Sequence, residues 1–307
     1  MTLYAWLNGE AFTSSTEQGL LLDRSNSFGD GVFETMLMHG GQVHLLERHL
    51  QRLSAGLVTL GLVDDDSLDA FLIAVRDDIQ RACGTVRQLA SGQSKASYID
   101  SSTAVIDSPT YVIKVLISRG ASVFGYSSQG LSVNRRLLMQ AYQPVDDTGR
   151  RVMICQTRLG SQPQLAGIKH CNRLEQVLAK REVQLAGFDD GLVCDQRGML
   201  CESTAANIFV LEQGQLVTPA IVDCGVAGVM RDYIVSTIAP KLGIAVQQET
   251  ISLQRLGRCE GLALSNAVQG FSRVSSLQLS ADQSIDWPVS ATLEAIAAEV
   301  KASIGLN

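Results

Sequence analysis

Three features that define other large classes of protein are missing from this sequence. No run of residues approaches the roughly 18 consecutive apolar residues that a transmembrane helix needs. The segment Met1–Glu10 has neither a basic start nor a long apolar core, so we do not expect a secretion signal. The 7 cysteines are scattered and contain no C-x-x-C pair. This favours reduced thiols in a cytoplasmic protein over a disulfide framework or a metal site.

The sequence also lacks internal repeats, low-complexity tracts and an excess of positive charge. Its net charge of −6 argues against a nucleic-acid-binding surface. With 46% hydrophobic and 18% charged residues it has the composition of a soluble globular protein, and 307 residues suffice for one large or two ordinary domains. We therefore expect a small molecule as the partner, and neither nucleic acid nor a membrane.

The stretch with the clearest chemical signature is Leu165–Val177, which contains Lys169. Gly167 removes side-chain bulk two residues before the lysine, so a flat ligand can approach the backbone there. Asn172 is expected to cap a following helix that stops at Gly187. Apolar surroundings would lower the pKa of Lys169 by desolvation and make its amine nucleophilic. For a lysine taken alone, a solvated surface position is the better interpretation. Helical spacing in this segment is shown by Leu174, Val177, Leu178 and Leu185.

Hydrophobic periodicity and turn residues predict strands and helices interspersed along the chain, which is a mixed α/β or α+β pattern. Asn8-Gly9 signals a hairpin turn, and the polar residues 90–110 predict a long loop. The expected strands include 32–38, 111–118 and 152–156. The expected helices are 46–60, 67–82, 226–240 and 289–304.

Polar residues on the first strand and the first helix are candidates for a site. His49 and Arg52 lie three residues apart on one helix face, which is more often a solvated face than a site. Glu34 is interpreted as an ordinary hairpin residue. Thr35 points to the opposite side of the strand from Glu34.

Two motifs resemble the fold-type IV enzymes that depend on pyridoxal 5′-phosphate (PLP). Gly-Ile-Lys-His-x-Asn-Arg-Leu-Glu-Gln-Val around Lys169 resembles the aminodeoxychorismate lyases, and Glu-x-x-x-x-Asn-x-Phe begins at Glu202. The resemblance extends from about Asn8 to Asn266. It implies a two-domain fold like that of the D-amino acid aminotransferases, with PLP between a smaller N-terminal α/β domain and a larger C-terminal domain with a barrel-like mixed sheet. We place these domains at 1–129 and 150–307, joined by a connection at 130–149.

The resemblance also implies roles for individual residues. Lys169 would carry PLP and act as the catalytic base, and Glu202 would accept a hydrogen bond from the pyridine nitrogen. Arg52 would bind the phosphate, a task that suits a permanently charged guanidinium. The rest of the phosphate site would be backbone from Gly228, Val229 and Met230, with Asn266 and Ala267.

Substrate contacts follow less directly from the resemblance. Arg119 would bind a substrate carboxylate, and Thr35 would be a catalytic hydroxyl. Many lyases of this type carry a further basic residue in the next loop, but here that loop, 121–126, has none.

The implied activity is conversion of 4-amino-4-deoxychorismate to 4-aminobenzoate and pyruvate for folate biosynthesis, by a cytoplasmic homodimer. Two alternatives stay open at this point. One is an aminotransferase for branched-chain or D-amino acids on the same scaffold. The other is a relative that binds PLP without turnover.

Overall fold

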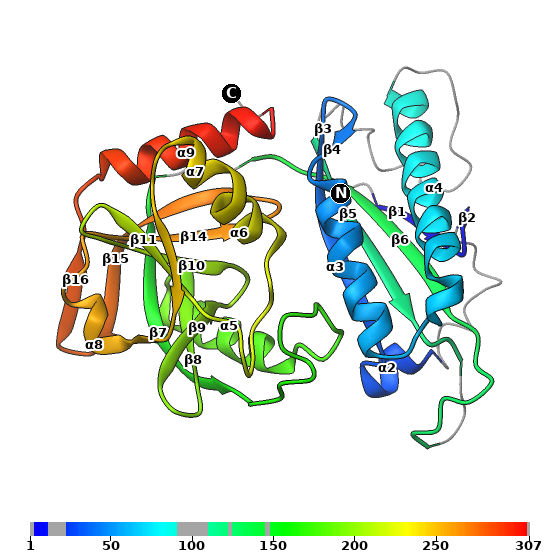
Figure 1. Cartoon of the computed structure of the whole chain (residues 1–307), viewed down its shortest axis with the longest axis horizontal. Coiled ribbons are helices and arrows are strands. Elements are labelled where there is room, and N and C mark those ends of the chain that lie inside the picture. Colours follow the sequence, from blue (N-terminus) through cyan, green and yellow to red (C-terminus); the bar gives the residue numbers. More distant parts are fainter. Residues whose placement is uncertain (1–2, 12–22, 91–109, 122–124, 145–147, 306–307) are drawn as a thin grey trace. The chain divides into compact units, whose positions relative to one another are not determined.

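The computed structural model describes residues 3–11, 23–90, 110–121, 125–144 and 148–305. Most of the predicted loop at 90–110 therefore lies outside the described residues. The chain forms two compact units (Figure 1). The first comprises residues 1–143 and 168–172, and the second comprises 144–167 and 173–307. The chain thus returns to the first unit for five residues, and Lys169 is one of them.

The first unit is an antiparallel sheet with helices on one face. Its strand order is β2-β1-β6-β5-β3-β4. The strands are β1 (Leu3–Leu7), β2 (Glu10–Ala11), β3 (Gly31–His39), β4 (Gln42–Val43), β5 (Thr110–Ser118) and β6 (Asn134–Ala141). The helices are α2 (Arg24–Phe28), α3 (Leu46–Thr59) and α4 (Asp65–Ala90). Figure 1 shows α3 and α4 covering the same side of this sheet.

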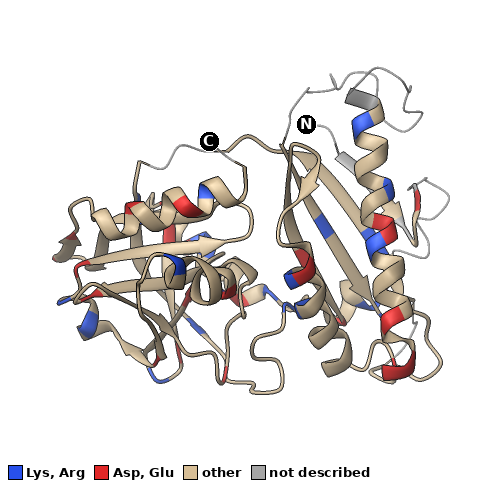
Figure 2. Ribbon diagram, turned by 45° about the horizontal axis from the view of Figure 1, so that its top comes forward, with Lys and Arg blue, Asp and Glu red and all other residues tan. Residues whose placement is uncertain are grey.

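Local sequence explains several of these elements. Asn8 and Gly9 both have positive φ, at 52° and 84°, as a two-residue hairpin requires, so the predicted hairpin between β1 and β2 is confirmed. Helix α3 matches the predicted helix 46–60 and buries Leu50, Leu53 and Leu57. Helix α4 carries acidic residues in its first turn and Arg87 in its last, which suits the helix dipole (Figure 2).

The boundary of the first unit differs from the prediction. Strand β6 lies within the segment 130–149 that was expected to connect the domains. It pairs with β1 and β5, and its buried Leu137 and Met139 belong to the core of the first unit. Leu137 and Met139 alternate with half-buried neighbours, as residues of a strand do, and the connection begins only after Ala141.

The second unit is built around a curved mixed sheet of ten strands, in the order β12-β11-β10-β14-β15-β7-β8-β9-β13 with β16 beside β15. Strand β9 also lies close to β10 and β11, so the sheet curls back on itself as the barrel-like prediction required. The strands are β7 (Arg150–Leu159), β8 (Asp190–Asp195), β9 (Met199–Ser203), β10 (Asn207–Glu212), β11 (Gln215–Pro219), β12 (Val246–Glu249), β13 (Ile251–Ser252), β14 (Gly261–Asn266), β15 (Gly270–Ser280) and β16 (Gln283–Asp286).

Helices of the second unit pack around this sheet. Helix α5 lies against β7 and β8, and α9 lies along β15 (Figure 1). The predicted helix 226–240 is divided into α6, a π-helical turn η2 and α7. The helical segments are α5 (Leu174–Ala186), α6 (Val229–Tyr233), η2 (Ile234–Ile238), α7 (Ala239–Lys241), α8 (Leu253–Leu256) and α9 (Ala291–Ser303).

Helix α5 begins differently from the prediction. Its N-cap is Arg173, which makes no side-chain capping bond, and Asn172 instead donates Nδ2 to the carbonyl of Gly29 at 3.2 Å. The predicted stop at Gly187 is confirmed, with φ of 74°. The buried side of the helix is formed by Ala179 and Val183. The larger apolar residues whose spacing predicted the helix are 45 to 79% exposed, and they are Leu174, Val177, Leu178 and Leu185.

No helix in the described part of the chain is both long and apolar enough to span a membrane.

Candidate active site

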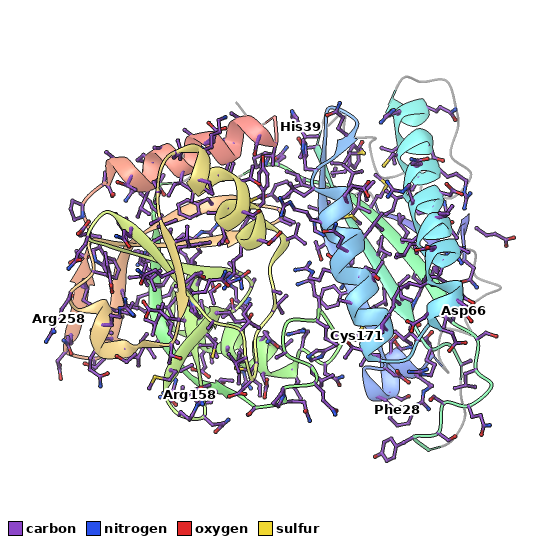
Figure 3. The ribbon with its side chains drawn as sticks, viewed as in Figure 1. Phe28, His39, Asp66, Arg158, Cys171 and Arg258 are labelled. Carbon is purple, nitrogen blue, oxygen red and sulfur yellow. The ribbon has the colours of Figure 1, made fainter. Side chains whose placement is uncertain are left out.

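Backbone hydrogen bonds hold the segment around Lys169 against strand β3. The amide of Phe33 donates to the carbonyl of Lys169 at 2.9 Å, and the amide of Cys171 donates to the carbonyl of Gly31 at 2.9 Å. The short segment that ends at Cys171, labelled in Figure 3, therefore pairs with the start of β3 in the antiparallel direction. Lys169 Nζ lies 4.6 Å from the centroid of the Phe33 ring. The cation–π contact orients the amine towards the side of the sheet that carries Phe33.

On the helix-covered side of β3, a buried carboxylate joins two residues of α3. Glu34 is 1% exposed. Arg52 donates Nε to Glu34 Oε1 at 2.8 Å and Nη2 to Oε2 at 2.5 Å, and His49 Nδ1 lies 2.5 Å from Oε2. His49 and Arg52 do share a helix face, as predicted. Glu34 is not an ordinary hairpin residue, because it is the partner of both.

Burial and the neighbouring charges both shift the pKa values of Glu34 and His49. Burial raises the pKa of Glu34, but the charge and hydrogen bonds of Arg52 and His49 outweigh it and lower the pKa to about 2. Burial also lowers the pKa of His49, helped by the positive charges of Arg52 and Lys169. The carboxylate is therefore ionised and the imidazole neutral at neutral pH.

The other side of β3 presents Thr35 together with a second lysine. Thr35 pairs with Lys114 of β5, and directly opposed residues in an antiparallel pair point to the same face. Lys114 is exposed, and its Nζ lies 4.9 Å from the centroid of the Phe33 ring. Two ammonium groups, from Lys169 and Lys114, therefore contact one aromatic ring. Lys114 is not among the site residues predicted from the sequence. Its charge in an otherwise apolar strand was a signal for it.

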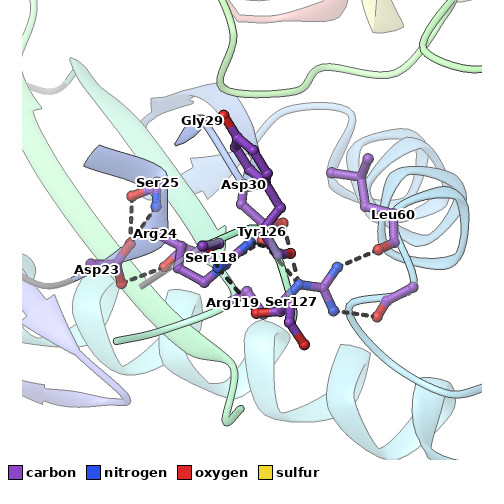
Figure 4. A network of polar contacts seen from close by, with 12 residues as sticks. Asp23, Arg24, Ser25, Gly29, Asp30, Leu60, Ser118, Arg119, Tyr126 and Ser127 are labelled. Carbon is purple, nitrogen blue, oxygen red and sulfur yellow. Dashed lines mark hydrogen bonds and ion pairs between the residues drawn. The ribbon is translucent and has the colours of Figure 1, made fainter. Parts of the chain in front are cut away.

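Arg119 follows the end of β5 and contacts other parts of the first unit (Figure 4). Its Nε donates to Asp30 Oδ2 at 3.0 Å, its Nη1 donates to the carbonyl of Gly61 at 2.7 Å, and its Nη2 donates to the carbonyl of Leu60. These contacts tie the end of α3 to the start of β3. The predicted role of Arg119 in binding a substrate carboxylate stays a prediction, since the structure gives its guanidinium these partners instead.

In the second unit, Glu202 lies near the end of β9 and is 5% exposed. Gln176 of α5 donates Nε2 to Glu202 Oε1 at 3.1 Å, and the amide of Val226 donates to Oε2 at 2.9 Å. Each carboxylate oxygen therefore has a fixed donor, and each retains a lone pair for another. Gln176 and Val226 hold the orientation of this carboxylate.

Gly228 is the N-cap of α6 and lies against Asn207 at the start of β10. A Cβ atom on Gly228 would meet Asn207 Oδ1 at 1.8 Å, so only glycine fits at this point. Asn207 also donates Nδ2 to the carbonyl of Val226 at 2.8 Å, which fixes the turn before the helix. The residues after the turn, Val229 and Met230, have buried side chains, so their contribution to an anion site is limited to the backbone.

Asn266 ends β14, next to the start of β10, because Asn207 pairs with Ser265. Its Oδ1 accepts the amides of Val268 and Gln269 at 3.0 and 2.8 Å, and so closes the turn that contains Ala267. The side chain of Asn266 thus shapes the turn. The second unit brings together the predicted residues around the start of β10, which are Glu202, Gly228, Val229, Met230, Asn266 and Ala267.

The sequence model of the amino-transferase class IV family matches residues 31–277. The chain belongs to this family. An aminodeoxychorismate lyase from Vibrio harveyi is 30% identical over 92% of this chain and 94% of the relative. A putative branched-chain-amino-acid aminotransferase from Methanocaldococcus jannaschii is 24% identical over 85% of this chain and 83% of the relative.

A solved structure of a 4-amino-4-deoxychorismate lyase from Pseudomonas aeruginosa superimposes with a TM-score of 0.77 and 28% identity, covering 97% of this chain and 98% of that one. A branched-chain aminotransferase from Thermoproteus uzoniensis has a TM-score of 0.78 at 18% identity, covering 99% of this chain and 95% of that one, and shows the shared fold. The predicted fold class, a two-domain fold-type IV enzyme, is confirmed.

The cofactor of this member of the class IV family is PLP. The residues present fit it, because each unit offers groups of the right chemistry. The first unit carries a lysine amine and a buried arginine, and the second carries a buried carboxylate and a backbone turn that a Cβ would fill. Among the described residues, no three His, Cys, Asp or Glu side chains gather as a metal site would require.

Proposed function

We propose that this class IV enzyme is an aminodeoxychorismate lyase, which converts 4-amino-4-deoxychorismate to 4-aminobenzoate and pyruvate. The observation that carries the proposal is the 30% identity to the Vibrio harveyi lyase over 92% of the chain, against 24% to the archaeal aminotransferase. The motif around Lys169 and the dipeptide Asn266-Ala267 support the same choice.

Lys169 is proposed to hold the cofactor and then to act as the base. PLP, when bound, acts as an electron sink that acidifies the C–H bond next to the substrate nitrogen. The Lys169 amine would be the base that removes that proton. The Phe33 ring, 4.6 Å from Nζ, would keep the amine oriented.

Glu202 is proposed to keep the pyridine nitrogen protonated, since a nearby carboxylate favours the charged form. Its orientation does not depend on the cofactor, because Gln176 and Val226 already hold both oxygens. Arg52, with Gly228 and its following amides, is proposed to bind the phosphate. Glu34 holds the Arg52 guanidinium in a single orientation.

The substrate has two carboxylates, and Lys114 provides a charge for one of them. Its exposed ammonium shares a sheet face with Thr35 and contacts the same ring as Lys169. We propose that Lys114 supplies the basic group that the loop 121–126 lacks. Thr35 is proposed to give the proton that the departing enol of pyruvate needs, and Arg119 remains a proposed second carboxylate ligand.

The test is incubation of the PLP-loaded protein with 4-amino-4-deoxychorismate and no 2-oxo acid. We expect pyruvate and 4-aminobenzoate in equal amounts, with the cofactor absorbance unchanged after turnover. A reaction that stops unless a 2-oxo acid is supplied would show an aminotransferase instead. Binding of PLP without turnover of the lyase substrate or of amino acids would show a non-enzymatic relative.

We also propose that the enzyme is a homodimer. The exposed apolar residues of α5 support this, because a contiguous apolar helix face in water favours association. Leu174, Val177 and Leu178 lie three and four residues apart and so share one side of the helix.

A further inference from the structure

Two cysteines of the second unit lie in direct contact. Cys201 of β9 and Cys224 of the loop 220–228 have their Sγ atoms 3.3 Å apart. All seven cysteines of the chain are free thiols. A disulfide has an S–S distance of about 2.05 Å, so closing this one requires a shift of about 1 Å.

The loop that carries Cys224 is held in place by contacts on both sides of the thiol. Before it, Asp223 forms an ion pair with Arg197 at 3.0 Å, and its carbonyl accepts the amide of Gln162 at 2.7 Å. After it, the carbonyl of Gly225 accepts the amide of Gly167 at 2.9 Å. These contacts keep Cys224 opposite Cys201 in the reduced protein, so little chain entropy is lost when the sulfurs join.

Thiolate character and access favour reaction at this pair. The hydrogen bond between the two thiols lowers the pKa of Cys224 and raises the pKa of Cys201. Both residues are half-buried, and the neighbouring Val222 is exposed, so a small reagent can reach them. By contrast, burial raises the pKa of Cys155 to about 12 and that of Cys259 to about 11. Thiolate character and access together determine which cysteine reacts first.

From this geometry we propose that Cys201 and Cys224 are a redox modification site, a dithiol that forms a reversible disulfide by exchange with a low-molecular-weight disulfide. The Cys224 thiolate attacks one sulfur of the small disulfide, forms a mixed disulfide and releases one small thiol. The Cys201 sulfur then attacks the Cys224 sulfur, forms the Cys201–Cys224 bond and releases the second small thiol. The two cysteine sulfurs are oxidised, and the small disulfide is reduced to two thiols.

The two cysteines lie next to the chain segments that hold the Glu202 carboxylate. Cys201 directly precedes Glu202 in β9, and Cys224 is two residues before Val226, whose amide binds the Glu202 carboxylate. The disulfide would join the two chain segments that this hydrogen bond already holds together. Neither thiol belongs to the residues proposed to bind PLP, so the modification does not depend on the proposed activity.

The experiment is equilibration of the native holoenzyme in buffers of reduced and oxidised glutathione, followed by acid quenching and alkylation. We expect the thiol count to fall from seven to five in oxidising buffer, and to return to seven with dithiothreitol. No trypsin site lies between the two cysteines, but a Glu-specific protease cuts after Glu202 and Glu212. Its fragments with Cys201 and Cys224 should then be joined only through the disulfide.

Three variants make the assignment specific. Cys201→Ser should stop at a glutathione adduct on Cys224, because the resolving sulfur is absent, and Cys224→Ser should lose no thiol pair. Cys259→Ser should behave as the wild type with one fewer thiol, which controls for the loss of any cysteine. Seven free thiols in the most oxidising buffer, or a disulfide between other cysteines, would overturn the proposal.

Discussion

Arg52 places two of its nitrogens on the two carboxylate oxygens of Glu34, at 2.8 and 2.5 Å. The bidentate pair fixes the plane of the guanidinium before any ligand binds. The carboxylate engages Nε and Nη2, which lie on one edge of the guanidinium. An arginine held in this way loses little side-chain entropy when it binds a phosphate.

The first prediction concerns the role of Arg52 in PLP affinity. Arg52→Ala removes a charge-assisted anchor worth roughly 1.5–3 kcal/mol, so PLP affinity should fall by about 10- to 100-fold. Arg48→Ala, on the same helix, is the matched control and should bind PLP nearly as the wild type does. Equilibrium dialysis measures both. Equal affinity in wild type and Arg52→Ala would remove Arg52 from the phosphate site.

The second prediction concerns stability against pH. The pKa of Glu34 falls from 4.5 to about 2 on folding, so its contribution is fully present above pH 5 and is lost as pH falls towards 2. A shift of this size corresponds to roughly 3 kcal/mol of unfolding free energy. In Glu34→Gln this part of the pH dependence should be absent. Urea unfolding of both proteins between pH 3 and 7 measures it, and parallel curves would contradict the ion pair.

A third prediction concerns Gly228. Gly228→Ala places a Cβ 1.8 Å from Asn207 Oδ1, so the turn before α6 must move and PLP occupancy should fall at least tenfold. Gly84→Ala, in α4, meets no atom within 4 Å and controls for the added methyl group. Absorbance of the purified proteins reports PLP content. Full occupancy in Gly228→Ala would show that this turn does not contact the phosphate.

A fourth prediction separates positioning from packing at Gln176. Gln176→Leu removes the donor to Glu202 Oε1 while keeping most of the volume, so kcat should fall by about tenfold with a shift in the cofactor absorbance. Gln184→Leu alters an exposed residue of the same helix and should change neither. A loss of thermal stability in Gln176→Leu without the kinetic and spectral changes would assign Gln176 a purely structural role.

The fifth prediction tests the homodimer. Leu178→Asp places a charge in the apolar face of α5 and should shift the protein to monomer in sedimentation velocity experiments. Val58→Asp is a close control, because Val58 is 44% exposed and Leu178 is 45% exposed. If both variants sediment as the wild type, the α5 face is not the interface.

Local signals explain the parts of the fold that the sequence predicted. Asn8-Gly9 specified a hairpin because both residues accept positive φ, and Gly187 specified the end of α5 for the same reason. Helical spacing also located α5, but it did not show which side is covered. That depends on β7 and β8, which pack against the small residues Ala179 and Val183 and leave the larger ones exposed.

The site residues that were overlooked depend on distant contacts. Glu34 is paired with His49 and Arg52 of a later helix, and the residues next to Glu34 in the sequence do not predict these partners. An ionised carboxylate between Val32 and Met36, which both enter the core, should nevertheless have implied a buried partner. Lys114 is similar, since its importance arises from the register that sets it opposite Thr35.

The five-residue return of the chain to the first unit has a consequence for protein engineering. A chimera that exchanges the first 143 residues with those of a relative would leave Ile168–Asn172 behind, facing a foreign β3. The backbone hydrogen bonds of Gly31 and Phe33 with Cys171 and Lys169 would then have to form between segments of two different proteins. Recombination of this scaffold therefore requires a discontinuous block, in which the lysine segment travels with the N-terminal sheet.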